Sequence, residues 1–136
     1  MTDDVVVNKC AIIDRCLARI REEYVGHEDE LATNFTRQDS IVLNLQRACE
    51  TSIDLANRLV RLNGLMIPQT SAESFALLTD AGLLSPELAK SLQGMVGFRN
   101  VAVHDYRRLN LDIVRHIVET RLSDFERFEA EALSSE

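Results

Sequence analysis

The sequence lacks the features of a membrane-spanning or secreted protein. Its longest unbroken apolar stretches are three or four residues, whereas a helix that crosses a bilayer needs about 20. The N-terminus, MTDDVVV, has no basic start followed by an apolar segment, so it does not resemble a secretory signal. We therefore expect a soluble, cytoplasmic protein that does not bind membranes.

Cysteine is also scarce. Cys10, Cys16 and Cys49 make an odd number, with no Cys-x-x-Cys pair and no matching histidine spacing, which argues against a disulfide framework and a zinc site. His27 precedes the acidic residues 28–30, but consecutive side chains converge poorly on one ion, so we expect a solvated turn there. The cysteines are predicted to be buried and reduced, and no metal or other cofactor is expected.

Lysine is rare among the basic residues, since 13 of the 15 are arginine. The planar guanidinium fork suits phosphate and carboxylate groups, although arginine is also simply a good helix former. The net charge of −7 opposes non-specific binding to nucleic acid, and we do not expect DNA binding. The charge is uneven, however: residues 119–136 sum to −4 and residues 94–108 to +2. A phosphate is thus expected only at that short arginine-rich segment.

The apolar spacing is helical throughout, and no strand alternation is present. Helix starts are predicted at Asp3 or Asp4, Asp39 or Ser40, Thr70, Ser85, and Asn110 or Asp112, and helix ends at Gly26, Gly64 and Gly82. Residues 27–34 are expected to form a connection or a short irregular helix. Gly94 and Gly97 weaken the helix that follows Ser85.

A seam of residues between Ile41 and Leu62, spaced alternately by four and three, runs along the longest predicted helix. We expect this seam to lie in the chain's own core rather than at a dimer interface. Together the patterns predict an all-α, up-and-down bundle of four to five helices, with residues 1–136 forming a single domain.

Polar residues interrupt the apolar pattern most strongly in FRNVAVHDYRR, residues 98–108. On a helix, Asn100 and His104 lie about 40° apart, so the amide could orient the imidazole, and Arg99 and Tyr106 lie within about 20°. Arg99 and His104 are about 140° apart on a straight helix. Either the helix distorts near Gly97, or the two side chains act on a ligand that lies across the helix end.

This set of residues suits RNA cleavage by the RNA's own 2′-hydroxyl. A histidine can transfer the protons near neutral pH, and an arginine can hydrogen-bond the phosphoryl oxygens through two nitrogens. One histidine cannot readily serve both sides of the same phosphate, so a two-fold dimer that brings two copies of the segment into one cleft is the economical arrangement. Arg107, Arg108 and Arg37 are further candidates for contacting RNA.

An arginine five positions before a histidine is by itself a weak signal. With arginine at about one position in ten, three histidines give about a one-in-four chance of such a pair. Most arginines and histidines on helices are ordinary surface or capping residues, and Tyr106 could be an amphipathic tyrosine at the edge of the core. His116 is expected at the surface or at an interface.

The wider sequence resembles the HepT family of HEPN-domain toxins, whose partners are minimal nucleotidyltransferase antitoxins of the MNT (MntA) type. The resemblance spans nearly the full length and is carried by three segments: FTRQDSIVLNLQRACE at 35–50, AGLLSPELAKSL at 81–92 and GFRNVAVHDY at 97–106. The last of these contains the family's Arg-x4-His-x-Tyr signature.

The resemblance implies a HEPN-like bundle that dimerises and acts as a metal-independent endoribonuclease toxin on tRNA or mRNA. Arg99 and His104 would be catalytic, and Asn100 would be the supporting polar residue of the catalytic set. Tyr106 would receive AMP units from the partner nucleotidyltransferase, which silences the toxin. The alternative is a non-catalytic helical module that partners a nucleotidyltransferase or binds a nucleotide, which the acidic net charge favours.

Overall fold

The computed structural model describes residues 3–134 as six α-helices and two short 3-10 helices, with no strand in that range. The α-helices are α1 (Asp4–Tyr24), α2 (Phe35–Leu62), α3 (Ser71–Asp80), α4 (Pro86–His104), α5 (Leu111–Thr120) and α6 (Leu122–Ser134), and the 3-10 helices are η1 (Glu28–Glu30) and η2 (Tyr106–Arg108). The all-α prediction is confirmed. No described helix is long and apolar enough to cross a membrane.

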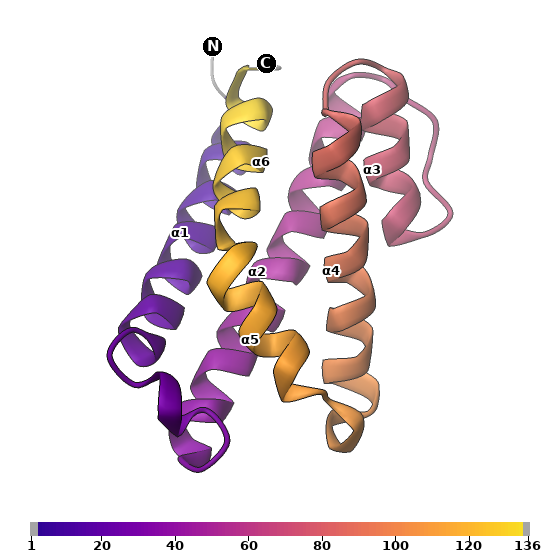
Figure 1. Ribbon diagram of the computed structural model, residues 1–136. Helices are drawn as coiled ribbons and strands as arrows, with labels where there is room; N and C mark the ends of the chain where they lie inside the picture. Colours follow the sequence, from indigo (N-terminus) through magenta and orange to yellow (C-terminus); the bar gives the residue numbers. More distant parts are fainter. Residues whose placement is uncertain (1–2, 135–136) are drawn as a thin grey trace.

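α2 is the central helix of the bundle. It packs against α1 on one side and against α3 and α4 on the other, and α6 also reaches it (Figure 1). α5 starts at the end of the molecule where α4 stops, and together with α6 it leads the chain back toward the other end (Figure 1). The end of α4 therefore lies at the opposite end of the bundle from the end of α6.

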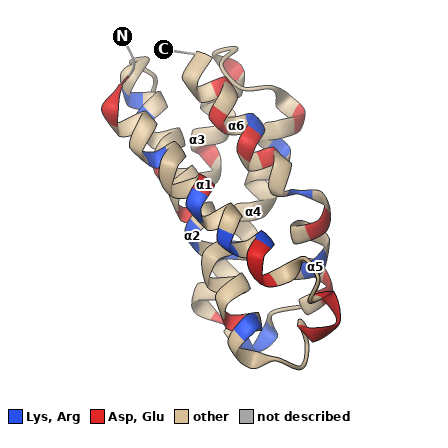
Figure 2. Cartoon of the chain, turned by 90° about the vertical axis from the view of Figure 1, so that its left-hand side faces the viewer, with Lys and Arg blue, Asp and Glu red and all other residues tan. Residues whose placement is uncertain are grey.

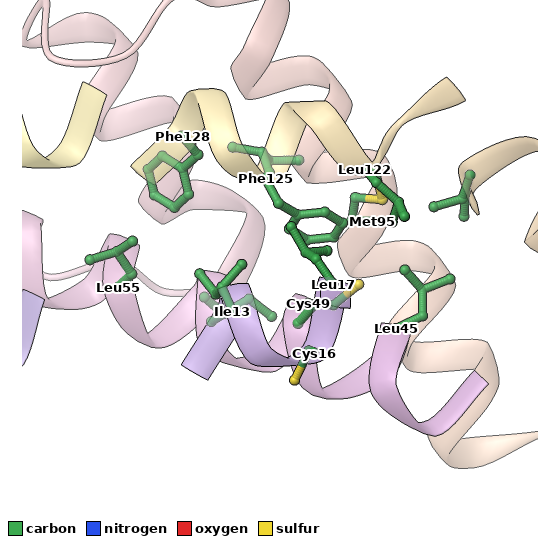
Figure 3. Close-up of a cluster of buried hydrophobic side chains, with 14 of the residues drawn as sticks. Ile13, Cys16, Leu17, Leu45, Cys49, Leu55, Met95, Leu122, Phe125 and Phe128 are labelled. Carbon is green, nitrogen blue, oxygen red and sulfur yellow. The ribbon is translucent and has the colours of Figure 1, made fainter. Parts of the chain in front are cut away.

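The predicted seam of α2 is buried inside the chain. Its residues Ile41, Leu45, Ala48, Ser52, Leu55 and Leu59 are all buried, and only Leu62 at the helix end is exposed. They meet apolar residues of α1, α4 and α6 (Figure 3). The three cysteines are buried free thiols, as predicted. The seam is thus intrachain core, which leaves other surfaces for any partner.

Several helix ends follow the local sequence signals. Asp3 accepts a hydrogen bond from the Val6 N–H (3.0 Å), and Thr70 caps α3 by accepting from the Glu73 N–H (3.1 Å). Gly82 follows α3 with a φ of +75°, a conformation that residues with a Cβ rarely adopt. The capping predictions at Asp3 and Thr70 are confirmed.

The predicted start of the longest helix is wrong, whereas the start predicted at Ser85 is confirmed in position but not in its capping bond. α2 begins at Phe35 rather than at Asp39 or Ser40, because Asn34, an equally good cap, accepts from the Arg37 N–H (3.1 Å). Ser85 does precede α4 at the cap position, but its hydroxyl does not cap the helix. Instead the backbone and side chain of Ser85 donate to the Glu131 carboxylate on α6 at 2.9 and 3.3 Å.

The last predicted helix is two helices, which makes six where four to five were expected. The break lies at Arg121, beside Thr120, whose hydroxyl donates to the carbonyl of His116 (2.6 Å). Such a bond to the preceding turn bends helices. The change of direction lets Phe125 and Phe128 of α6 reach the core, where Phe128 packs edge-on against Phe75 with ring centroids 5.7 Å apart.

Glu129 is a buried carboxyl on α6 that faces the carboxyl of Asp14 on α1. Burial, followed by the hydrogen bond with Asp14 and its charge, raises the pKa of Glu129 to about 8 from an ordinary value of 4.5. The folded chain therefore retains this proton over a pH range in which the unfolded chain has lost it. The free energy of unfolding contributed by Glu129 must fall as the pH rises from about 4.5 to about 8.

We therefore expect Glu129→Gln to stabilise the protein at alkaline pH. The amide cannot ionise, so the variant should exceed the wild type by on the order of 2–4 kcal/mol at pH 8.5, with the gap closing toward pH 4.5. Urea unfolding at a series of pH values measures this. Glu87→Gln, at an exposed position on α4, is the matched control and should show no pH-dependent gap. A gap for Glu129→Gln that does not change with pH would contradict this assignment.

Candidate functional site

Arg99 lies about a turn and a half before the end of α4 and is half-buried. It is close enough to α2 to act on the buried thiol of Cys49: burial raises the pKa of that thiol, and the positive charge of Arg99 opposes the effect. The Nε atom of Arg99 is buried and has no hydrogen-bond partner among residues 3–134. A buried donor without an acceptor costs about 1–3 kcal/mol, so Arg99 gains from an acceptor supplied from outside the chain.

His104 is the last residue of α4, and both it and Asn100 are exposed. No hydrogen bond joins the Asn100 amide to the imidazole in the part of the chain that the structure describes. α4 remains helical through Gly97, so Arg99 and His104 keep the divergence of about 140° that a regular helix imposes. A distortion near Gly97 therefore does not bring the two side chains together. The remaining alternative is that both act on a ligand lying across the end of α4.

α4 stops because Asp105 leaves the helical conformation, with φ −152° and ψ 63°. Its N–H still donates to the carbonyl of Val101 (2.8 Å), which closes the last turn. Tyr106 then begins η2. The expectation that Tyr106 shares a helical face with Arg99 is therefore wrong, because the helix ends two residues before the tyrosine.

Tyr106 is directed instead toward the start of α2. Its hydroxyl donates to Oδ1 of Asp39 at 2.7 Å, across 67 positions of sequence. The tyrosine is 43% exposed, and Asp39 is exposed as well. Partial burial, then the hydrogen bond and negative charge of Asp39, raise the pKa of Tyr106 to about 12. The contact joins the candidate site on η2 to α2.

Asp39 is the residue of this site that sequence reasoning missed. The sequence places it where a helix cap is expected, and the actual cap is Asn34. No local signal marks Asp39 as a partner of the tyrosine, because the contact depends on the return of η2 to α2. Only the fold brings the two together.

Two arginines follow Tyr106 at the surface. The Nε atom of Arg108 pairs with Asp105 at 3.1 Å, with the Arg108 side chain 84% exposed, so this pair contributes little to stability. Arg107 is exposed and makes no ion pair within residues 3–134. Both guanidinium groups are accessible to an anion beside η2.

Arg37 is bound within its own chain. Its Nη1 donates to the carbonyl of Glu23 (3.0 Å), and carboxylate oxygens of Glu23 and Glu30 lie at 3.7 and 3.8 Å from its guanidinium. The side chain is only 21% exposed. Arg37 thus fastens the start of α2 to the end of α1 and to η1, although its Nε, like that of Arg99, has no hydrogen-bond partner among residues 3–134.

The other histidines make ordinary surface contacts. His27 pairs with Glu30 at 2.9 Å between Nδ1 and Oε2, and the exposed His116 lies beside Thr120. Within residues 3–134 no group of three or more His, Cys, Asp or Glu side chains is placed to hold a metal ion.

Acidic and basic residues are interspersed along α1 and α6 (Figure 2).

An apolar groove of about 260 Å³ lies beside the site, between α4 and the start of α5. Gly94, Gly97 and Val101 line it from α4, and Ile113 lines it from α5. A Cβ atom placed at either glycine would meet nothing within 4 Å, and Val101 and Ile113 are exposed. The chain leaves this face of α4 uncovered.

The sequence of this chain matches a known protein family. Residues 13–132 match the family model described as Ribonuclease HepT-like. The chain is 50% identical over 126 residues to the mRNA nuclease HepT of Shewanella oneidensis, covering 93% of this chain and 94% of the relative.

Solved structures agree with that match. A tri-AMPylated Shewanella oneidensis HEPN toxin in complex with an MNT antitoxin superimposes with a TM-score of 0.91 at 48% identity, over 98% of this chain and 99% of the other. A toxin–antitoxin structure with AMP-PNP gives a TM-score of 0.90 at 47% identity, over 96% of this chain and 98% of the other.

The contacts of Arg37 predict a structural role that a substitution can separate from ligand binding. Arg37→Ala removes the charged hydrogen bond to the Glu23 carbonyl and the two longer contacts with Glu23 and Glu30, so the free energy of unfolding should fall by about 1–3 kcal/mol. Arg107→Ala, at an exposed position with no ion pair in the described chain, is the matched control and should change it by less than about 0.5 kcal/mol. Denaturant unfolding measures both, and equal stability of the two variants would contradict the structural role.

Proposed function

Because the chain belongs to the ribonuclease HepT-like family, we propose that it is the toxin of a type VII HepT/MntA pair and cleaves RNA as a metal-independent endoribonuclease. The observation that carries this proposal is the segment at residues 98–106, which puts an arginine, an asparagine and a histidine in the last turns of α4 and a tyrosine just beyond its end. The substrate is mRNA or tRNA, and the site of action is the cytoplasm.

Arg99, Asn100 and His104 form the catalytic set. The His104 imidazole takes the proton from a ribose 2′-hydroxyl, or returns one to the leaving oxygen. Arg99 donates to the phosphoryl oxygens on which charge accumulates, and its buried unpaired Nε is suited to such an acceptor. Asn100 supports the site through its exposed amide. Arg107 and Arg108 hold the flanking phosphates, and Arg37 is the weakest of the three candidates, because its side chain is mostly buried and its Nη1 already donates to the Glu23 carbonyl.

A second copy of the chain completes the cleft. One chain holds Arg99 and His104 on diverging sides of α4, and a two-fold dimer adds a second pair. The uncovered face formed by Gly94, Gly97 and Val101 permits close approach of another helix. Burying this face would remove the exposed apolar side chains from water. Sedimentation equilibrium should therefore give twice the chain mass of 15.3 kDa.

Tyr106 is the site at which a partner nucleotidyltransferase neutralises the toxin by attaching AMP. The chain has two tyrosines, and Tyr24 is 4% exposed with its hydroxyl bonded to Glu119 and Arg115. Only Tyr106 offers an accessible phenol. A phosphate attached there adds negative charge beside His104 and Arg107, which repels an RNA backbone and occupies the site.

The proposal predicts that His104→Ala abolishes RNA cleavage while leaving the fold intact. Loss of a proton-transferring group typically costs about 10²–10⁴ in rate, and the exposed position of His104 means that the truncation leaves no cavity. The rate is measured on total RNA with purified protein made without the antitoxin. His27→Ala, which changes a half-buried histidine far from the site in sequence, is the matched control and should cleave at the wild-type rate.

Uncleaved RNA with the wild type, together with equal growth of hosts that express the wild type or His104→Ala, would favour the non-catalytic module. That alternative predicts a stable complex with the nucleotidyltransferase that does not depend on His104.

A further inference from the structure

The Tyr106–Asp39 contact is not required by the local structure of either partner. η2 is held by backbone bonds, from the Arg108 N–H to the Asp105 carbonyl (3.0 Å) and from the Leu109 N–H to the Tyr106 carbonyl (3.1 Å). α2 is capped by Asn34. Within residues 3–134, the Asp39 side chain makes no hydrogen bond or ion pair other than the one with Tyr106. The exposed Asp39 carboxylate thus has the Tyr106 phenol as its one hydrogen-bond partner in the described chain.

The geometry is that of a base and its nucleophile. The phenolic hydrogen already points at Oδ1, with the two oxygens 2.7 Å apart, inside the range for general-base catalysis. Tyr106 and Asp39 are both exposed, so an incoming nucleotide can reach the pair from solvent. His104 and Asp105 precede Tyr106 in sequence, but neither bonds to the phenol, and Asp105 pairs with Arg108.

The phenol of Tyr106 also needs such a base. With its pKa near 12, about one molecule in 10⁵ carries the phenolate at pH 7. The neutral phenol is a poor nucleophile, because a proton must leave as the new bond forms. A carboxylate in hydrogen-bond contact can accept that proton during the attack rather than before it.

We propose that Asp39 is the general base that activates Tyr106 for AMP transfer, an inference that rests on the proposed function. The phenol oxygen attacks the α-phosphorus of an adenosine triphosphate held by the partner nucleotidyltransferase, and the O–P bond forms. The bond from the α-phosphorus to the bridging oxygen breaks, and pyrophosphate leaves with the electron pair. The phenolic proton passes to Oδ1 of Asp39 and from there to solvent. The toxin would thus contribute a catalytic residue to its own inactivation.

The test measures the initial rate of the first AMP addition by intact mass, with ATP and the purified partner nucleotidyltransferase. Asp39→Asn keeps the shape and removes the base, and it should slow the first addition by about 100-fold at pH 7. Asp39→Glu restores a carboxylate and should recover at least a tenth of the wild-type rate. Asp54→Asn, an exposed carboxylate-to-amide change on the same helix, is the matched control and should stay within about twofold of the wild type.

Two further readouts separate a base from a merely structural residue. The ratio of wild-type to Asp39→Asn rates should fall as the pH rises from 7 to 9.5, because free phenolate increasingly replaces the base; the partner's own pH dependence cancels in the ratio. A phenol oxygen takes one AMP, so any later unit is joined to a hydroxyl of the preceding nucleotide. Those later additions should be unaffected by Asp39→Asn, and this comparison does not depend on how much of the variant is folded.

The outcomes separate the inference from the function on which it rests. Equal first-addition rates for Asp39→Asn and the wild type, or a rate ratio that does not change with pH, would overturn the role of Asp39 and leave AMPylation of Tyr106 standing. AMP addition to Tyr106→Phe at the wild-type rate, or none to the wild type, would overturn AMPylation of Tyr106 itself.

Discussion

The burial of one face of α2 is the constraint on which the rest of the structure depends. Its seam residues, from Ile41 to Leu59, are surrounded by α1, α3, α4 and α6, and at roughly 1.5–3 kcal/mol for each large apolar side chain buried this is the main source of stability. Because α2 is 28 residues long, its first turns extend to the end of the bundle where α4 stops. That extension places Asp39 within reach of Tyr106.

The candidate site lies where helical order gives way. α4 is regular up to His104, Asp105 breaks it, and η2 turns Tyr106 toward α2. A histidine at a helix end has one side open to solvent, whereas Arg99, a turn and a half earlier, is partly enclosed. The two groups therefore differ in environment as the proposed roles require: an imidazole in contact with water for proton transfer, and a guanidinium whose Nε lacks an acceptor.

Much of the fold follows from local sequence signals, and the failures have physical causes. The spacing from Ile41 to Leu59 defines a helix face regardless of its surroundings, and Asp3 and Thr70 cap through bonds to residues only three positions away. Asn34 and Asp39 are both acceptable caps, so sequence alone could not choose between them. The break at Arg121 depends on where α6 must pack, which only the assembled core determines.

For the site, the segment at residues 98–106 could be found from sequence, but the Asp39 contact joins residues 67 positions apart and has no local signature.

In the proposed mechanism, the histidine and arginine at the end of α4 promote cleavage of RNA by the RNA's own 2′-hydroxyl. The most direct measurement is the chemistry of the cleaved ends, obtained with purified protein and an RNA substrate in the presence of a chelator. Attack by the 2′-hydroxyl leaves 2′,3′-cyclic phosphate ends, and the same RNA with a single 2′-deoxy sugar at the cut position should not be cleaved. Cleavage of the deoxy-substituted RNA, or 5′-phosphate ends that vanish with the chelator, would contradict this mechanism.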